Sequence, residues 1–140
     1  MQLLGLDDQE ESLVEKTRLH LKKYGSEISN VAAGIQTSKG TEFFGLCIDL
    51  KTATLGSCAE YSAVGTMLSS GEKRIRTIVA VAEKGRGGYR VLPPCGKCRD
   101  LVRGFGNPYV ILQVGSSTRE AKKVRLSQLL PFPWDRTPAR

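Results

Sequence analysis

Two cysteine motifs, far apart in the sequence, restrict the possible folds of this chain more than any other feature. The first is Cys-Ala-Glu at residues 58–60, and the second is Pro-Cys-Gly-Lys-Cys at residues 94–98. Each motif stands where a helix is predicted to begin. A Cys-x-x-Cys pair in a reducing compartment is typical of a metal or catalytic site. A fold that lets the two motifs act together must place two helix N-termini side by side.

The spacing of apolar residues divides the chain into helix-like and strand-like segments. Helices are predicted where apolar residues recur every three or four positions, over residues 8–24, 58–69 and 95–103. Strands are predicted for short apolar or alternating runs, over residues 30–36, 42–50, 76–83 and 109–114. Residues 84–92 contain three glycines and are predicted to form a loop, and residues 126–130 a short turn.

The order of these elements predicts an architecture. Ser-Lys-Gly at residues 38–40 is turn chemistry, so the first two strands should form an antiparallel hairpin. Two later strand–helix–strand connections favour a mixed sheet with helices on its faces. We expect a three-layer α/β/α fold with a mixed five-stranded sheet, whose fifth strand comes from residues 116–126 or from the tail. One domain over residues 1–140 is expected, with residues 135–140 frayed.

Local signals predict helix ends and buried faces. Asp7 and Glu10 predict a capping box at the start of the first helix, and Gly25 predicts its end. The expected buried faces are those of Leu13, Thr17, Leu21 and Tyr24 in the first helix and of Ala59, Ala63, Val64, Met67 and Leu68 in the second.

Charge and hydropathy narrow the choice of partners and compartment. The net charge is +7, but the basic residues are scattered and few aromatics lie among them, so we interpret them as a solvated surface and nucleic acid as an unlikely partner. No apolar run approaches the ~20 residues that cross a bilayer. The acid-rich start does not resemble a secretory signal. We expect a cytoplasmic protein without a membrane partner.

Three of the four cysteines suit a catalytic zinc site. Zinc prefers tetrahedral coordination, and a catalytic site keeps one position for water, so Cys58, Cys95 and Cys98 plus water would complete it. Three thiolates outweigh a divalent cation. Two helix N-termini and a hydrogen bond from Arg99, which follows Cys98, are expected to offset that charge.

Glu60 is the expected catalytic residue. It lies two positions after Cys58, where it can reach the site without ligating the metal. A carboxylate there can take a proton from water, pass it to a ring nitrogen and later protonate a departing amine. Zinc nucleobase deaminases share this acid–base pattern.

These residues resemble the signature of the cytidine deaminase superfamily, a His or Cys followed by Ala-Glu and later by Pro-Cys-x-x-Cys. The all-cysteine version is similar to the small homotetrameric nucleoside deaminases, including the blasticidin-S type. The likeness extends over residues 29–134, through the predicted hairpin to Leu-Leu-Pro at residues 129–131 and an aromatic residue, Trp134. The resemblance implies a zinc-dependent hydrolase of a cytosine-like aminopyrimidine nucleoside or analogue.

The resemblance also implies substrate contacts, at Cys47, Asp49, Ala59 and Trp134. Trp134 would cover the site of a neighbouring subunit in a homotetramer. Cys47 and Asp49 stand where the family has an Asn and a Glu that bind ribose. A thiol does not replace an amide, so the sequence predicts that cytidine is a poor substrate, with a loss of about 1–3 kcal/mol per missing contact.

Other interpretations remain at this stage. Ser-Cys-Ala-Glu at residues 57–60 is also a capping box, and the Cys-x-x-Cys pair is also a redox motif. Cys47 could complete a structural four-cysteine zinc site, although a packed core thiol fits its apolar neighbours better. At the level of function, the alternatives are a deaminase that edits nucleic acid and a non-catalytic zinc-stabilised binding module.

Overall fold

The computed structural model describes residues 1–117 and 120–135. Its helices are α1 (Asp8–Tyr24), α2 (Ala59–Ser69), α3 (Gly96–Arg103) and α4 (Leu126–Leu129), with a 3-10 turn η1 at Ala53–Leu55. Its strands are β1 (Val31–Thr37), β2 (Glu42–Leu46), β3 (Ile75–Glu83), β4 (Tyr89–Leu92), β5 (Tyr109–Gln113) and β6 (Ala121–Arg125). Most of the tail predicted to fray, residues 136–140, lies outside the described residues.

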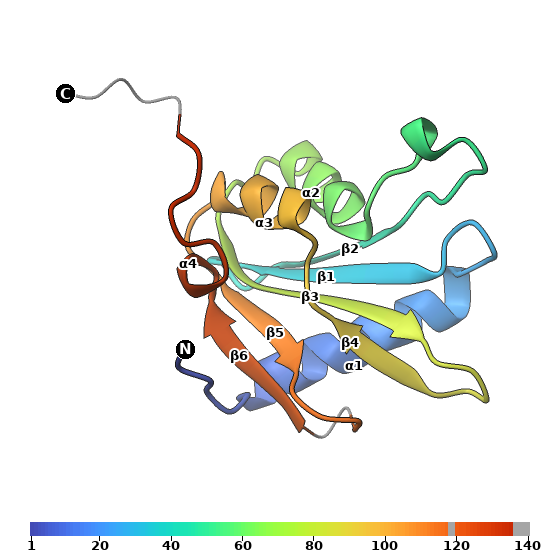
Figure 1. Cartoon of the computed structure of the whole chain (residues 1–140), viewed down its shortest axis with the longest axis horizontal. Coiled ribbons are helices and arrows are strands. Elements are labelled where there is room, and N and C mark those ends of the chain that lie inside the picture. Colours follow the sequence, from blue (N-terminus) through green and yellow to red (C-terminus); the bar gives the residue numbers. More distant parts are fainter. Residues whose placement is uncertain (118–119, 136–140) are drawn as a thin grey trace.

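The strands form one mixed sheet in the order β2-β1-β3-β5-β6 (Figure 1). The hairpin of β1 and β2 is antiparallel, as predicted, and β3 is antiparallel to β1 but parallel to β5. The fifth expected strand is β6, within residues 116–126. The prediction of five strands is wrong, because β4 adds a sixth: residues 89–92, expected in a loop, pair with the end of β3.

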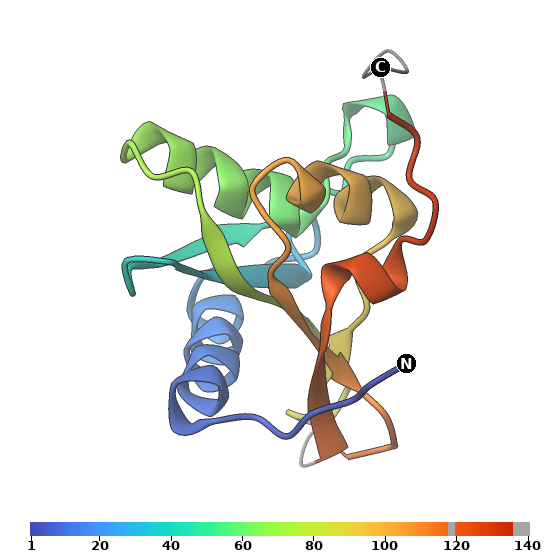
Figure 2. The same ribbon diagram turned by 90° about the vertical axis from the view of Figure 1, so that its left-hand side faces the viewer.

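The sheet lies between two layers of helices, which confirms the predicted three-layer class. Helix α1 crosses one face, and α2 and α3 lie side by side on the other (Figures 1 and 2). Successive side chains of a strand point to opposite faces. Ala32 therefore packs under α1, whereas Ala33 and Ile35 pack under α2.

Helix α1 has the predicted bounds for local reasons. Asp7 accepts from the backbone of Glu10 and Glu10 accepts from the backbone of Asp7, which is the predicted capping box. The N–H of Gly25 closes the helix on Leu21. The predicted buried face is wrong at Tyr24, which is exposed on the last turn.

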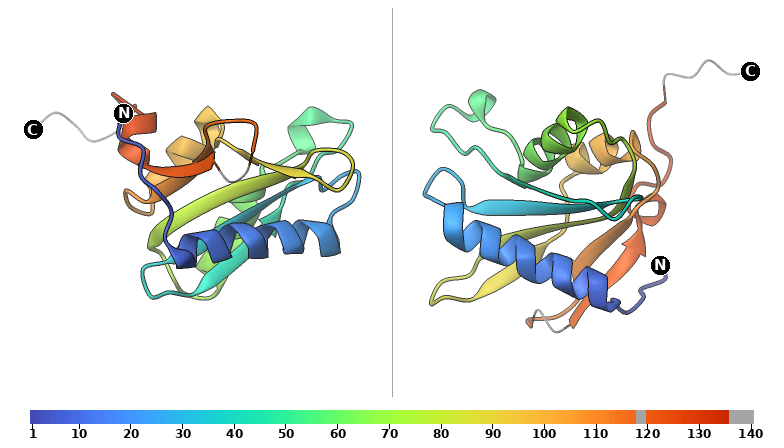
Figure 3. Two further views of the ribbon diagram at one scale, coloured as in Figure 1. Left: turned by 90° about the horizontal axis from the view of Figure 1, so that it is seen from below. Right: turned by 180° about the vertical axis from the view of Figure 1, so that it is seen from behind.

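The segment before α1 crosses toward the opposite edge of the sheet. Figure 3 shows it running from the start of α1 to the side of β6, where Leu4 forms a bridge with Lys123.

Leu68, which was also expected to be buried, is exposed at the end of α2. Among the described residues, no helix is long and apolar enough to span a bilayer.

Candidate active site

The two cysteine motifs form the N-termini of α2 and α3, as the sequence predicts. Cys58 is the N-cap residue of α2 and Cys95 that of α3. A two-way backbone bridge between Ile48 and Ser57 holds the start of α2 against the end of β2. Strand β4 positions the second motif. The pairing of β4 with β3 ends at Leu92, and only two prolines separate Leu92 from Cys95.

The three expected ligands meet in one cluster. The Sγ atoms of Cys58, Cys95 and Cys98 all lie within 4.8 Å of one another. The Sγ atoms of Cys58 and Cys95 are 3.7 Å apart, and the backbone N–H of Cys98 donates to Cys95 Sγ at 3.4 Å. All four cysteines of the chain are free thiols. Three soft sulfur donors facing a common point fit zinc, which favours thiolate ligands in tetrahedral sites.

The thiols of the cluster differ in acidity. Burial raises the pKa of Cys58, more than its hydrogen bond with Cys98 lowers it. Burial also raises the pKa of Cys98, and the nearby Glu60 carboxylate raises it further. At Cys95 burial acts in the same direction, but hydrogen bonds from the backbone and side chain of Cys98 and from Cys58 outweigh it and lower the pKa. Cys95 is thus the thiol best prepared to be anionic.

Glu60 lies beside this cluster and is 5 % exposed. It lines the same pocket as Cys58 and Cys95. The interpretation of residues 57–60 as a capping box is wrong, because the N-cap is Cys58, without a side-chain cap bond, and Ser57 belongs to the bridge with Ile48. The carboxylate is therefore not used to begin the helix.

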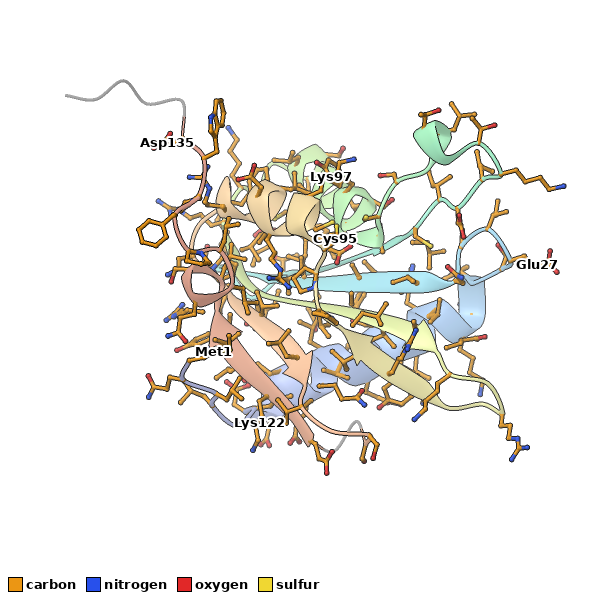
Figure 4. All side chains as sticks on the ribbon, viewed as in Figure 1. Met1, Glu27, Cys95, Lys97, Lys122 and Asp135 are labelled. Atoms are coloured by element: carbon orange, nitrogen blue, oxygen red, sulfur yellow. The ribbon has the colours of Figure 1, made fainter. Side chains whose placement is uncertain are left out.

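The pocket has a volume of about 430 Å³, within the range of small-molecule sites. Its walls come from two groups of residues. The N-termini of α2 and α3 contribute Cys58, Ala59, Glu60, Cys95 and Lys97, and the ends of the strands contribute Asn30, Cys47 and Asp49. Figure 4 shows Cys95 and Lys97 at the start of α3, next to α2. Three of the four expected substrate contacts, Cys47, Asp49 and Ala59, thus line the pocket beside the cluster.

Trp134, the fourth expected substrate contact, does not line the pocket. It lies beyond α4, where its carbonyl accepts from Arg103 at the C-terminal end of α3. The pocket, in contrast, is at the N-terminal end of that helix. Trp134 is 69 % exposed. Within one chain, Trp134 does not cover the candidate site.

Arg99 does not take the role expected from the sequence. Its Nε donates to the Pro94 carbonyl at 2.8 Å and its Nη1 to the Leu129 carbonyl at 3.0 Å. Over the described residues, its hydrogen bonds go to carbonyls and not to a thiolate. Arg99 therefore fixes the peptide before Cys95 to the end of α4, which is a positioning role.

Two residues of the pocket were missed in the sequence. Lys97 lies between two of the expected ligands, and its Nζ sits 4.6 Å from the centre of the Tyr61 ring. Asn30 precedes β1, and its Oδ1 accepts from Cys47 Sγ at 3.3 Å. The position of Lys97 inside the motif was a usable signal. Asn30 had none, because only the pairing of β1 with β2 brings it to Cys47.

Known proteins resemble this chain in both sequence and fold. Blasticidin-S deaminase of Bacillus cereus is 28% identical, over 97% of this chain and 99% of its own length. A cytidine deaminase of Halalkalibacterium halodurans is 27% identical, over 72% and 74%. The crystal structure of cytidine deaminase from Mycobacterium leprae has a TM-score of 0.72 at 21% identity, covering 89% of this chain and 99% of that one. No protein-family model matches.

The sequence relatives, the similar fold and the clustering of the two cysteine motifs all indicate the same family of proteins. The relatedness extends across nearly the full chain in the Bacillus cereus protein, so it is not restricted to the motifs. The structural neighbour has the same fold over most of the chain. On these grounds, the chain is similar to proteins of the cytidine deaminase superfamily in both sequence and fold.

Proposed function

We propose that this protein is a zinc-dependent hydrolytic deaminase of a cytosine-like aminopyrimidine nucleoside or a nucleoside analogue. The reaction replaces a ring amine with a carbonyl, consumes water and releases ammonia. A blasticidin-S-like antibiotic belongs to the candidate substrates, since the relative that covers most of this chain is a blasticidin-S deaminase.

One observation carries the proposal: three thiols form one cluster, and a buried carboxylate lines the same pocket as two of them. Cys58, Cys95 and Cys98 would hold the zinc, which when bound supplies Lewis-acid activation of water. A purely structural zinc site would not need a buried carboxylate facing the pocket. Glu60 is such a carboxylate, and its negative charge is near enough to raise the pKa of Cys98.

Glu60 moves the protons in this proposal. The carboxylate accepts a proton from the attacking water and gives it to the ring nitrogen of the substrate. It then takes the second proton from the hydroxyl group that has added to the ring and gives it to the amine, which leaves as ammonia while the carbonyl forms. Because Glu60 is buried, bulk water does not compete strongly for its proton. Ala59, buried beside it at the N-terminus of α2, also lines the pocket.

Lys97 is proposed to offset the negative charge of the cluster in place of Arg99. It lines the pocket and lies on the first turn of α3, between Cys95 and Cys98. The two helix N-termini add partial positive charge at the same point. A site rich in thiolates is maintained in a reducing compartment, so a cytoplasmic location is part of the proposal.

Ammonia release tests the proposal. The zinc-loaded protein is incubated with cytosine, cytidine, deoxycytidine, adenosine, blasticidin S and a cytosine-containing oligonucleotide, and ammonia is measured. Release from a pyrimidine nucleoside or the antibiotic is expected. Release from the oligonucleotide alone, falling steeply with salt, would show a nucleic-acid deaminase instead. No release from the whole panel, with zinc bound, would favour a binding module.

A further inference from the structure

A second pocket lies on the other side of the sheet from the candidate active site. It has a volume of about 250 Å³ and lies between the last turns of α1 and the turn that joins β3 to β4 (Figure 3). Two of its lining residues, Leu21 and Tyr89, belong to or pack on the core cluster beneath α1. It shares no lining residue with the pocket beside the cysteines. The proposed deamination therefore does not use it.

Positive charge prevails in this second pocket. Arg18, Lys22 and Arg86 line it, together with one carboxylate, Glu83. Arg18 donates from Nε and Nη2 to Glu15, at 2.9 and 2.6 Å, which leaves its Nη1 for another acceptor. Over residues 1–117 and 120–135, Lys22, Arg86 and Glu83 form no ion pair. Cationic groups that surround a cavity without being neutralised favour an anionic ligand.

The backbone of the turn between β3 and β4 adds further donors. Gly85, Arg86 and Gly87 line the pocket, and all three have positive φ angles, of 44°, 54° and 75°. Two backbone bonds close the turn, from the N–H of Gly88 to Gly85 and from the N–H of Lys84 to Gly88. Within the described part of the chain, the N–H groups of residues 85–87 have no hydrogen-bond partner. Successive N–H groups in a turn of this kind form a concavity that binds anions.

Arg86 is an unfavourable residue for this turn. Side chains other than glycine seldom adopt a positive φ, whereas the glycines on either side of Arg86 adopt it without strain. Residues held in such conformations cluster at ligand sites, where the side chain itself is required. The side chain of Arg86 supplies a guanidinium group to the pocket.

We propose that this second pocket binds a phosphate group, carried by inorganic phosphate or by a small phosphate monoester. The cationic side chains and the N–H groups of the turn would donate to the phosphate oxygens. Glu83 repels an anion without a proton, but it can accept from a P–OH group, which a monoester keeps up to about pH 6. The pocket therefore selects phosphate over sulfate and over phosphodiesters. This inference is independent of the proposed function.

Calorimetric titration of the full-length chain at pH 6 and constant ionic strength tests the inference. The ligands are inorganic phosphate, glycerol 3-phosphate and sulfate. We expect wild type to bind at least one of the two phosphates about tenfold more tightly than sulfate, because only phosphate can donate to Glu83. Binding of glycerol 3-phosphate alone would identify a monoester as the ligand.

Arg86→Gly is the sharpest variant, because it removes the guanidinium group and relieves the strained φ angle together. It should therefore fold at least as stably as wild type, while its affinity for phosphate falls about tenfold. Lys23→Gln is the matched control. It removes one positive charge next to Lys22 but outside the pocket, so phosphate affinity should change by less than about twofold.

Glu83→Gln tests the selection itself and should tighten sulfate binding about tenfold, because the repelling charge is gone. Three results would overturn the inference. One is no binding of either phosphate by wild type at millimolar concentration, and another is sulfate binding as tight as phosphate binding. The third is equal weakening by Arg86→Gly and Lys23→Gln, which indicates only the general positive charge of the surface. Tighter binding of oligothymidine than of either phosphate, falling steeply with salt, would show a nucleic-acid surface instead.

Discussion

Three thiols of one type have three different environments in this site. Cys98 is fully buried, Cys58 half-buried and Cys95 exposed at the helix start. The backbone N–H of Cys98 stabilises the anion at Cys95, whereas burial disfavours it at Cys58 and Cys98. Burial therefore opposes ionisation at two of the three positions. Binding a cation would reverse that preference, because ligands must be deprotonated.

Replacing one of the proposed ligands should remove the metal. Cys58→Ala leaves two of the three sulfurs, so we expect zinc content to fall from equimolar to a small fraction and thermal stability to drop with it. Elemental analysis of the purified protein measures this. Cys47→Ala is the matched control, since Cys47 bonds to Asn30 and is not part of the cluster; it should retain zinc. Full zinc in Cys58→Ala would disprove the ligand assignment.

Neutralising Glu60 should separate catalysis from metal binding. Glu60→Gln keeps the shape of the side chain but loses the proton acceptor, so we expect unchanged zinc content and a turnover number lower by about two to four orders of magnitude. Ammonia release at saturating substrate gives the turnover number. Wild-type turnover in this variant would mean that Glu60 is not the proton carrier.

At the scale of elements, α2 lies unusually close to β2. A Cβ atom on Gly45 would meet the backbone nitrogen of Ala63 and would come within 2.6 Å of the carbonyl carbon of Ser62. Glycine at this position is therefore what lets the helix rest directly on the strand. The same contact sets the height of the N-terminus of α2, and with it Cys58 and Glu60, over the sheet.

A methyl group at Gly45 should push α2 away from the sheet. Gly45→Ala is expected to lower the free energy of unfolding by about 1–3 kcal/mol or more, and to weaken zinc retention as Cys58 moves. Urea unfolding measures the first effect. Gly65→Ala is the control on the exposed side of α2, where a Cβ meets nothing within 4 Å; it should raise stability by about 0.5–1 kcal/mol. Equal stability of Gly45→Ala and wild type would contradict the close approach.

The packing of α1 on the hairpin gives one pH-dependent contribution to stability. His20 stacks on Phe44 at 5.4 Å and contacts Tyr24, and its partial burial, helped by Lys23, lowers its pKa from 6.5. Below pH 6.5 the unfolded chain takes up a proton that the folded chain binds less readily. Folding is therefore penalised progressively as the pH falls through that value.

The variant His20→Phe keeps a ring between Phe44 and Tyr24 but cannot titrate. We expect wild type to lose more stability than His20→Phe when the pH is lowered from 7.5 to 5.5, because only wild type has the depressed histidine. Unfolding free energies at several pH values give the difference between the two proteins. Parallel pH profiles would show that His20 has its ordinary pKa in the folded state.

At the scale of the whole molecule, the candidate site lies at one end of the sheet, whereas the C-terminal tail lies at the other end of α3. The pocket forms where β1 begins, β2 ends and two helices start. After α4 the chain runs along α3 to Arg103, and Phe132 and Trp134 are both largely exposed there. Pro131 and Pro133 have restricted φ angles, and Phe132 between them has a φ of 51°, so the chain turns at this point. We propose that Trp134 covers the pocket of a second copy within a homotetramer.

Two changes to the tail test this assembly. Deleting residues 135–140 should leave activity near that of wild type. Trp134→Ala should raise KM about tenfold without removing zinc, because stacking on a flat ring is lost. Light scattering should show a tetramer for wild type. An active monomer would rule out the shared site and leave Trp134 as a surface aromatic.

The sequence by itself determined the parts of this protein that depend on local chemistry. The bounds of α1 follow from a capping box and a 3.6-residue apolar period, both of which act within one or two turns. The starts of α2 and α3 at Cys58 and Cys95, and the convergence of their thiols, were predicted because the motif itself requires it.

Only the tertiary structure decided the features that depend on partners distant in the sequence. Residues 89–92 became β4 because the end of β3 offered unpaired backbone groups beside them. Arg99 turned to the carbonyls of Pro94 and Leu129, and Asn30 met Cys47, because packing brought these segments together. A hydrogen bond between remote residues depends on their positions in space, and local spacing does not encode those positions.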